Sequence, residues 1–141
     1  MFNYLKNLPF EIDKLFEKYN SNVKKGTNLF RGLNLTQDKF DKLGLKVGEI
    51  ISINNNPNLY TSFSTNFRQA KYFAKNKYLD KRIIFITKAI GKELNIEQLS
   101  TIDNEKEHLI KRGKMAKIKQ IKELKDKDGK KWLIVKIEQI E

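Results

Sequence analysis

The sequence predicts one α+β domain in which strands dominate the C-terminal half. The first half holds stretches whose apolar side chains recur at near-helical spacing, whereas the second half holds short apolar or alternating runs typical of strands. A chain of 141 residues fits one domain and can bury a sizeable core without disulfides. Neither an internal repeat nor a low-complexity linker divides it, so we expect a single domain over residues 1–141.

The first half alternates helical and extended patterns. Pro9 begins a helical pattern over residues 9–19, and a stop and turn follow at 20–26. Further on, we expect a strand at 28–33, a short helix at 37–43 that ends near Gly44, an extended segment at 45–53, a loop at 54–58, a strand at 59–64 and a helix at 67–74.

The second half reads mostly as strands. The run Ile83-Ile84-Phe85-Ile86 is short enough to be a buried strand, and Trp132 lies in an alternating segment typical of sheet packing. The expected strands cover 82–89, 93–96, 108–110, 114–121 and 131–140, with a polar loop at 98–104 and a turn at 126–129.

Composition excludes several classes of function. The chain has no cysteine, which excludes disulfides and thiolate catalysis, and its single histidine, His108, excludes a multi-histidine metal site. We expect no metal. No stretch approaches about 18 apolar residues, and residues 1–10 do not form a signal-peptide core, so we expect neither a membrane span nor a secretory leader.

The net charge of +12 is unevenly distributed. Residues 68–88 carry the basic side chains Arg68, Lys71, Lys75, Lys77, Lys81, Arg82 and Lys88 against the single acid Asp80. Such a segment can simply solvate the surface, or it can attract a polyanion or an acidic partner. The aromatic pattern of RNA-binding modules does not accompany these lysines, and both interpretations stay open.

Three spaced motifs carry the chemistry. Arg31 lies in Leu-Phe-Arg-Gly-Leu, Ser64 in Ser-Phe-Ser-Thr-Asn, and Glu105 and Glu107 in Glu-Lys-Glu-His-Leu, each beside a short apolar run. A cation can hold a diphosphate, a hydroxyl can orient a carboxylate, and a carboxylate can stabilise positive charge that develops on a ribose. No motif is specific alone, but the ordered set predicts a site that cleaves NAD.

The set resembles the mono-ADP-ribosyltransferases of the Arg–Ser–Glu type, which include bacterial toxins, phage-borne enzymes and vertebrate ecto-enzymes. The resemblance covers residues 28–137, with 33 residues from Arg31 to Ser64 and 43 from Ser64 to Glu107. It implies a split β-sandwich with N-terminal and intervening helices, and NAD in the cleft between its sheets. It also implies a monomer that transfers ADP-ribose from NAD to a macromolecule, foremost a protein arginine, and releases nicotinamide.

Family roles fall on particular residues of this chain. The resemblance implies that Arg31 binds an NAD phosphate and that the backbone of Gly32 lies near the nicotinamide carboxamide. A guanidinium fork suits a phosphate well. Ser64 is expected to hydrogen-bond Glu107 and hold its carboxylate under the nicotinamide ribose, and Thr65 to help close the cleft.

The chain departs from the family pattern at Asn66, where the usual Ser-Thr-Ser reads Ser-Thr-Asn. Asn can supply comparable hydrogen bonds to NAD. A register that begins at Ser62 would place Phe63 where Thr belongs. Phe73 or Phe67 is expected to stack on nicotinamide, although a place in the core is equally consistent with the helical pattern.

Glu107 is the predicted catalytic carboxylate, because it would stabilise the charged ribosyl centre as glycosidase carboxylates do. Glu105, two residues earlier on an extended segment, would point to the same side and meet the incoming nucleophile. In the family, Glu at that first position accompanies arginine as the acceptor, and Gln accompanies other acceptors. His108 should face away from Glu107, as a structural or surface residue.

Three alternatives stay open: an enzyme of the same fold that modifies RNA or DNA, an NAD glycohydrolase, and an inert binding module. Loops 54–58 and 97–104 are expected to recognise the target, and a cognate immunity protein is a further possible partner. The resemblance implies a toxin, an effector or a phage protein that acts in the cytoplasm of a bacterial or host cell after delivery by a secretion system or a phage.

Overall fold

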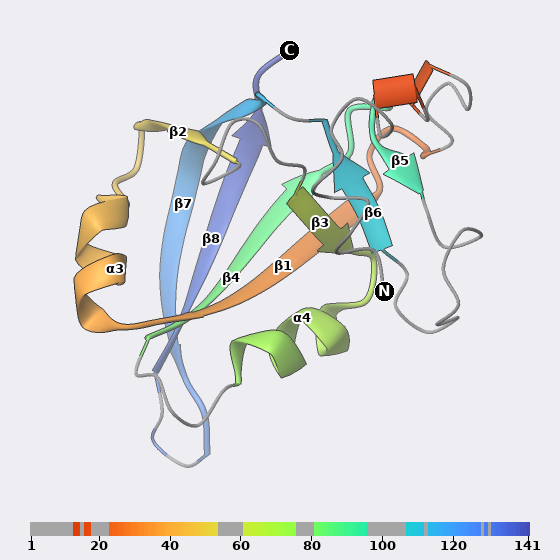
Figure 1. The fold of residues 1–141 in the computed structure, drawn as a ribbon. Coiled ribbons are helices and arrows are strands. Elements are labelled where there is room, and N and C mark those ends of the chain that lie inside the picture. The colour runs from red at the N-terminus through yellow and green to blue at the C-terminus, as the bar shows by residue number, and fades with distance from the viewer. Residues whose placement is uncertain are drawn as a thin grey trace.

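The described part of the chain forms one mixed sheet with helices beside it (Figure 1). The computed structural model describes residues 13, 14, 16, 17, 23–53, 61–75, 81–95, 107–111, 113–127, 129 and 131–141. Its elements are β1 (Asn28–Leu35), α3 (Gln37–Leu43), β2 (Ile50–Ser52), β3 (Thr61–Ser64), α4 (Phe67–Ala74), β4 (Lys81–Lys88), β5 (Leu94–Asn95), β6 (Glu107–Ile110), β7 (Met115–Lys125) and β8 (Lys131–Gln139). The predicted α+β class is confirmed.

The eight strands lie in the order β2-β7-β8-β4-β1-β3-β6-β5, with β4 parallel to β8 and the other pairs antiparallel. Strand β1 pairs with β4 along all eight of its residues, but with β3 through the single pair Phe30–Ser64. We call this pair the seam. It divides the sheet into a five-strand group, β2-β7-β8-β4-β1, and a three-strand group, β3-β6-β5.

The main hydrophobic core takes side chains from both groups. Phe63 of β3 and Ile110 of β6 belong to the same buried cluster as Leu29, Phe85 and Val135 of the five-strand group. In Figure 1, β3 and β6 lie in front of β1. Two strand groups that share one core have the arrangement of a split sandwich, which confirms the predicted fold.

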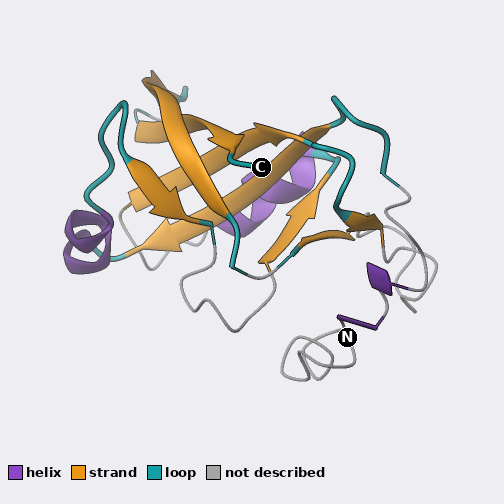
Figure 2. Ribbon diagram, turned by 90° about the horizontal axis from the view of Figure 1, so that it is seen from above, coloured by secondary structure: helices purple, strands orange, loops and turns teal. Residues whose placement is uncertain are grey.

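Helix α4 covers the opposite face of the five-strand group. Ala70 and Ala74 pack there with Ile84 and Trp132, and Figure 2 shows a helix lying against one side of the strands. The approach is very close at Gly32 of β1, where a Cβ atom would lie 1.7 Å from the carbonyl oxygen of Ala70. Only glycine fits there, because the obstacle is helix backbone and no side chain can move aside.

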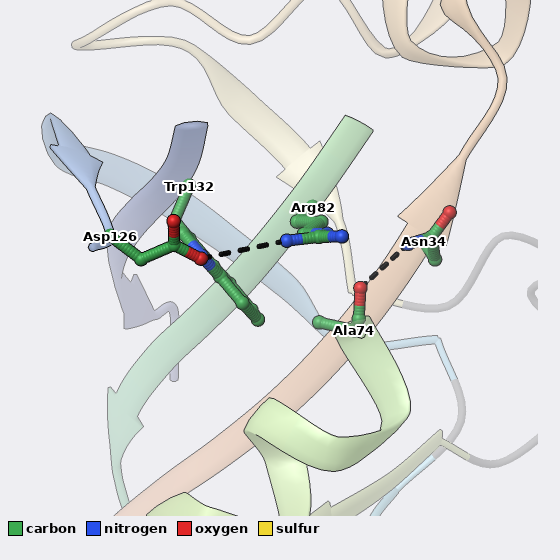
Figure 3. A network of polar contacts seen from close by, with 5 residues as sticks. All are labelled: Asn34, Ala74, Arg82, Asp126 and Trp132. Atoms are coloured by element: carbon green, nitrogen blue, oxygen red, sulfur yellow. Dashed lines mark hydrogen bonds and ion pairs between the residues drawn. The ribbon is translucent and has the colours of Figure 1, made fainter. Parts of the chain in front are cut away.

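Polar contacts hold α4 and the neighbouring strands together near the C-terminus of the helix (Figure 3). Asn34 Nδ2 donates to the Ala74 carbonyl at 2.6 Å, which satisfies an acceptor at the C-terminus of α4. The buried Arg82 places Nη1 3.7 Å from Asp126 Oδ2, and Trp132 Nε1 donates to the same oxygen at 3.2 Å. The Arg82 guanidinium also lies 5.2 Å from the centroid of the Trp132 ring. These contacts join β1, α4, β4 and the β7–β8 turn.

Helices α3 and α4 have the bounds that the sequence predicted, and cap residues mark their ends. Thr36 accepts a hydrogen bond from Lys39 N at the start of α3, and Gly44 ends it with φ 57°. The predicted extended segment 45–53 was largely wrong, because Gly48 turns the chain with φ 93° and only Ile50–Ser52 forms a strand.

Strand bounds differ more than helix bounds. Strand β1 continues to Leu35 and β7 to Lys125, beyond their predicted ends. Of the predicted helix at 9–19, the described residues 13, 14, 16 and 17 are helical. The predicted loops at 54–58 and 98–104 lie outside the described residues.

Replacing Gly32 with Ala should lower the free energy of unfolding by about 1–3 kcal/mol, as overpacking does, because α4 must move away from β1. Urea unfolding followed by circular dichroism would measure the change. A Gly32→Ala variant as stable as the parent chain would show that α4 does not approach β1 this closely.

Candidate active site

The strands that carry the three motifs lie next to one another in the order β1-β3-β6. Ser64 at the end of β3 pairs with Phe30, the neighbour of Arg31, on one side and with Glu107 at the start of β6 on the other. Residues far apart in the sequence therefore meet at the seam. In the other register that the sequence offers, the leading serine would be Ser62, which pairs with Leu109.

Arg31 links the two strand groups beside the seam. Its half-buried guanidinium donates from Nη1 to the carbonyl oxygen of Ser62 at 3.0 Å. The motif arginine thus has a structural task that the sequence did not predict. It supplements the single backbone pairing between β1 and β3.

The Ser-Thr-Asn segment forms the entry to α4. The buried Ser64 accepts a hydrogen bond at Oγ from Asn66 N at 2.9 Å, and Asn66 Oδ1 accepts one from Arg68 N at 2.9 Å. Asn66 is the N-cap of α4, with extended backbone angles. This explains physically why Asn can replace Ser at the third position. The sequence carried the clue, since Asn directly before a helical run is a common N-cap.

The two acidic positions differ in what the structure describes. The backbone of Glu107 begins β6 opposite Ser64, whereas Glu105 lies outside the described residues. The next residue, His108, is buried and pairs with Phe63 and Asn95. His108 was predicted to be a structural or a surface residue, and its burial makes it a structural one.

The aromatic candidates sit at different places on α4. Phe73 is 57% exposed, so the alternative that placed it in the core was wrong: the buried side of α4 consists of Ala70 and Ala74. Phe67, at the start of the helix, is 40% exposed and meets the ring of Phe30 edge-on at 5.5 Å. Both rings remain candidates to stack on nicotinamide.

Among the residues that the structure describes, no three His, Cys, Asp or Glu side chains gather closely enough to hold a metal ion. The helices in that part of the chain are also too short or too polar to cross a membrane.

Comparisons with known proteins reveal a likeness in fold. No family model and no curated protein sequence matches the chain. Among solved structures, the Vis toxin, an ADP-ribosyltransferase from Vibrio splendidus, matches with a TM-score of 0.60 and 20% identity over 100% of this chain and 62% of that chain. The C3 exoenzyme of Clostridium limosum matches with a TM-score of 0.62 and 19% identity over 94% of this chain and 67% of that chain. HopU1, an ADP-ribosyltransferase of Pseudomonas syringae pv. Tomato DC3000, matches with a TM-score of 0.63 and 17% identity over 91% of this chain and 50% of that chain.

The chain therefore has the fold of bacterial ADP-ribosyltransferases, and the resemblance found in its motifs is confirmed at the level of fold. It spans between 50% and 62% of the length of the three Vis structures that it matches.

Replacing Asn66 with Ala should destabilise the protein by about 1 kcal/mol through loss of the α4 cap, whereas Ser, an equally good cap, should preserve stability. Thermal unfolding of both variants would measure this. If the Ser variant lost as much stability as the Ala variant, the side chain of residue 66 would serve some purpose other than capping.

Proposed function

We propose that this chain is a mono-ADP-ribosyltransferase that transfers ADP-ribose from NAD to a protein arginine and releases nicotinamide. The observation that carries the proposal is the strand register at the seam, which sets Ser64 opposite Glu107 and next to the strand of Arg31. The ADP-ribosyltransferase fold supports the same function.

The placement of three described residues supports NAD as the proposed substrate. The antiparallel register sets the backbone of Glu107 directly opposite Ser64, and in this proposal the Ser64 hydroxyl orients the Glu107 carboxylate. That carboxylate would stabilise the positive charge that develops on the ribose as the nicotinamide bond breaks. Arg31, half-buried on the neighbouring strand, would meet the diphosphate with its charge. The proposal needs no metal, since the diphosphate stays on the product.

Arginine as the acceptor rests on two observations. The Glu-Lys-Glu motif supplies a second carboxylate, Glu105, which could hold a guanidinium next to the ribose. One Vis structure is a complex with agmatine, a small molecule that carries the same guanidinium group as an arginine side chain. A protein target also agrees with exoenzyme S of Pseudomonas aeruginosa, a fold neighbour whose structure is a complex with human 14-3-3 protein beta.

The positive charge favours a second candidate, a nucleic-acid acceptor. Arg68 and Lys71 on α4 and Lys75 at its C-cap are exposed, and this helix begins directly beside the seam and contains no acid. Incubation with labelled NAD and a bacterial lysate, with and without nuclease, would separate the acceptors. Label in arginine side chains supports a protein target, label in RNA or DNA supports the second candidate, and nicotinamide release without a labelled acceptor indicates a glycohydrolase.

Replacing Glu107 with Gln should lower both transfer and NAD hydrolysis by about 10²-fold or more, the usual cost of losing one electrostatic stabiliser. Nicotinamide release measured by chromatography would test this. Glu49, exposed and outside the site, provides the matched control, since Glu49→Gln should retain full activity. Parent-level turnover in Glu107→Gln would refute the proposed function.

Replacing Glu105 with Gln should abolish transfer to agmatine while leaving much of the NAD hydrolysis, because only the acceptor step loses its partner. Both activities can be measured in one reaction with labelled NAD. An equal fall in the two, or no change in either, would remove Glu105 from acceptor binding.

A further inference from the structure

Glu93 is a buried carboxylate that the proposed chemistry does not use. It is 1% exposed and lies between β4 and β5. Its Oε2 accepts hydrogen bonds from Ile90 N at 2.8 Å and Gln139 Nε2 at 2.7 Å, and its Oε1 from Gly91 N and Lys92 N, both at 3.1 Å. Four donors thus converge on one side chain, which is how a charge can be buried at acceptable cost.

The contacts of Glu93 join three strands at their ends. Gln139 is the last residue of β8, and its Nε2 also donates to the carbonyl oxygen of Lys88, the last residue of β4, at 3.2 Å. Glu93 itself directly precedes β5. The carboxylate and the amide therefore tie the start of β5 to the five-strand group.

This tie lies at the outer edge of the three-strand group, opposite the seam. Strand β5 pairs with β6 through Leu94–Leu109 and Asn95–His108, and Glu107 is the next residue along β6. Residues 96–106, which contain Glu105, connect β5 to β6 in the sequence. On the inner edge, the described contacts that join β3 to β1 include one backbone pairing and the Arg31–Ser62 hydrogen bond.

We propose that Glu93 and Gln139 form a positioning pair that fixes β5 and β6 relative to β1 and so holds Glu107 in place relative to the strand of Arg31. This inference rests on the proposed function. The pair touches no reacting atom, and it acts through the strand that carries the catalytic carboxylate.

Substitution of Glu93 by Gln tests the pair, because an amide has one acceptor oxygen and turns an NH₂ group towards backbone N–H donors. Gln139→Leu removes the other half and provides a second variant should the first fail to fold. Glu93→Asp keeps the carboxylate, and Glu138→Gln, on the exposed side of the same strand as Gln139, is the matched control.

We expect kcat for NAD hydrolysis to fall about 10–100-fold with little change in KM, since ångström-scale misplacement of a catalytic group has costs of this size. The fall should occur in Glu93→Gln and Gln139→Leu, be partly rescued in Glu93→Asp, and be absent in Glu138→Gln. Folded Glu93→Gln and Gln139→Leu variants with the parent kcat would overturn the inference.

Amide hydrogen exchange tests the pair without any reaction. Exchange should accelerate in β5 and β6 of the Glu93 and Gln139 variants and stay unchanged in the parts of β7 and β8 that lie away from Gln139. Uniform acceleration across all strands would overturn the inference, because it would make the pair a general stabiliser. If Glu107→Gln retained full activity while β5 and β6 still loosened in the Glu93 variants, the proposed function would fail and the structural tie would stand.

Discussion

The near-interruption of the sheet at Phe30 and Ser64 is the constraint on which the site depends. Strand β1 pairs with β4 along its whole length but with β3 at one residue. Further pairing between β1 and β3 would keep the two strand groups in one continuous surface, and side chains such as Phe63 could not share a core with Phe85. No pairing at all would separate Ser64 from the strand of Arg31. The single pair Phe30–Ser64 lets the two strand groups share a core and keeps Ser64 beside the strand of Arg31.

Such a sparse junction needs reinforcement from side chains. The Arg31 guanidinium bonds to β3 next to the seam, and Phe30 meets Phe67 at the start of α4. Gly32 and Asn34 then hold the rest of that helix on β1. Alternate residues of one strand thus serve different layers: Arg31 reaches β3 across the seam, while Phe30, Gly32 and Asn34 face α4.

The sequence predicted best those features that local chemistry determines. The bounds of α3 and α4 were predicted because helical spacing is local and short polar residues or glycine occur where each helix begins or ends, and the second half was recognised as strands from its apolar runs and alternation. The exposure of Phe73 could not be predicted from the sequence. Helical spacing alone groups Phe73 with Ala70 and Ala74, and only the contact at Gly32, from a distant strand, brings the alanine side of the helix against the sheet.

For the candidate site, the motifs supplied candidate residues but not their arrangement. Strand order and the Ser64–Glu107 register depend on pairing between segments that are distant in sequence, which no local pattern specifies. Glu93 had no sequence clue at all. A glutamate between a glycine-containing turn and a leucine resembles any surface acid, and its burial depends on Gln139, 46 residues later.

The two outermost strands bear on how this chain behaves at high concentration. An open strand edge can recruit a strand from another molecule, and proteins limit that risk with short or charged edges. Among the described residues, the sheet ends at β2 and β5, which have three and two residues. Beyond its short contact with β2, β7 carries exposed lysines at 119, 122 and 125. The basic side chains of β7 are therefore expected to have a second physical effect, because charged groups along an edge oppose pairing with a strand of another molecule.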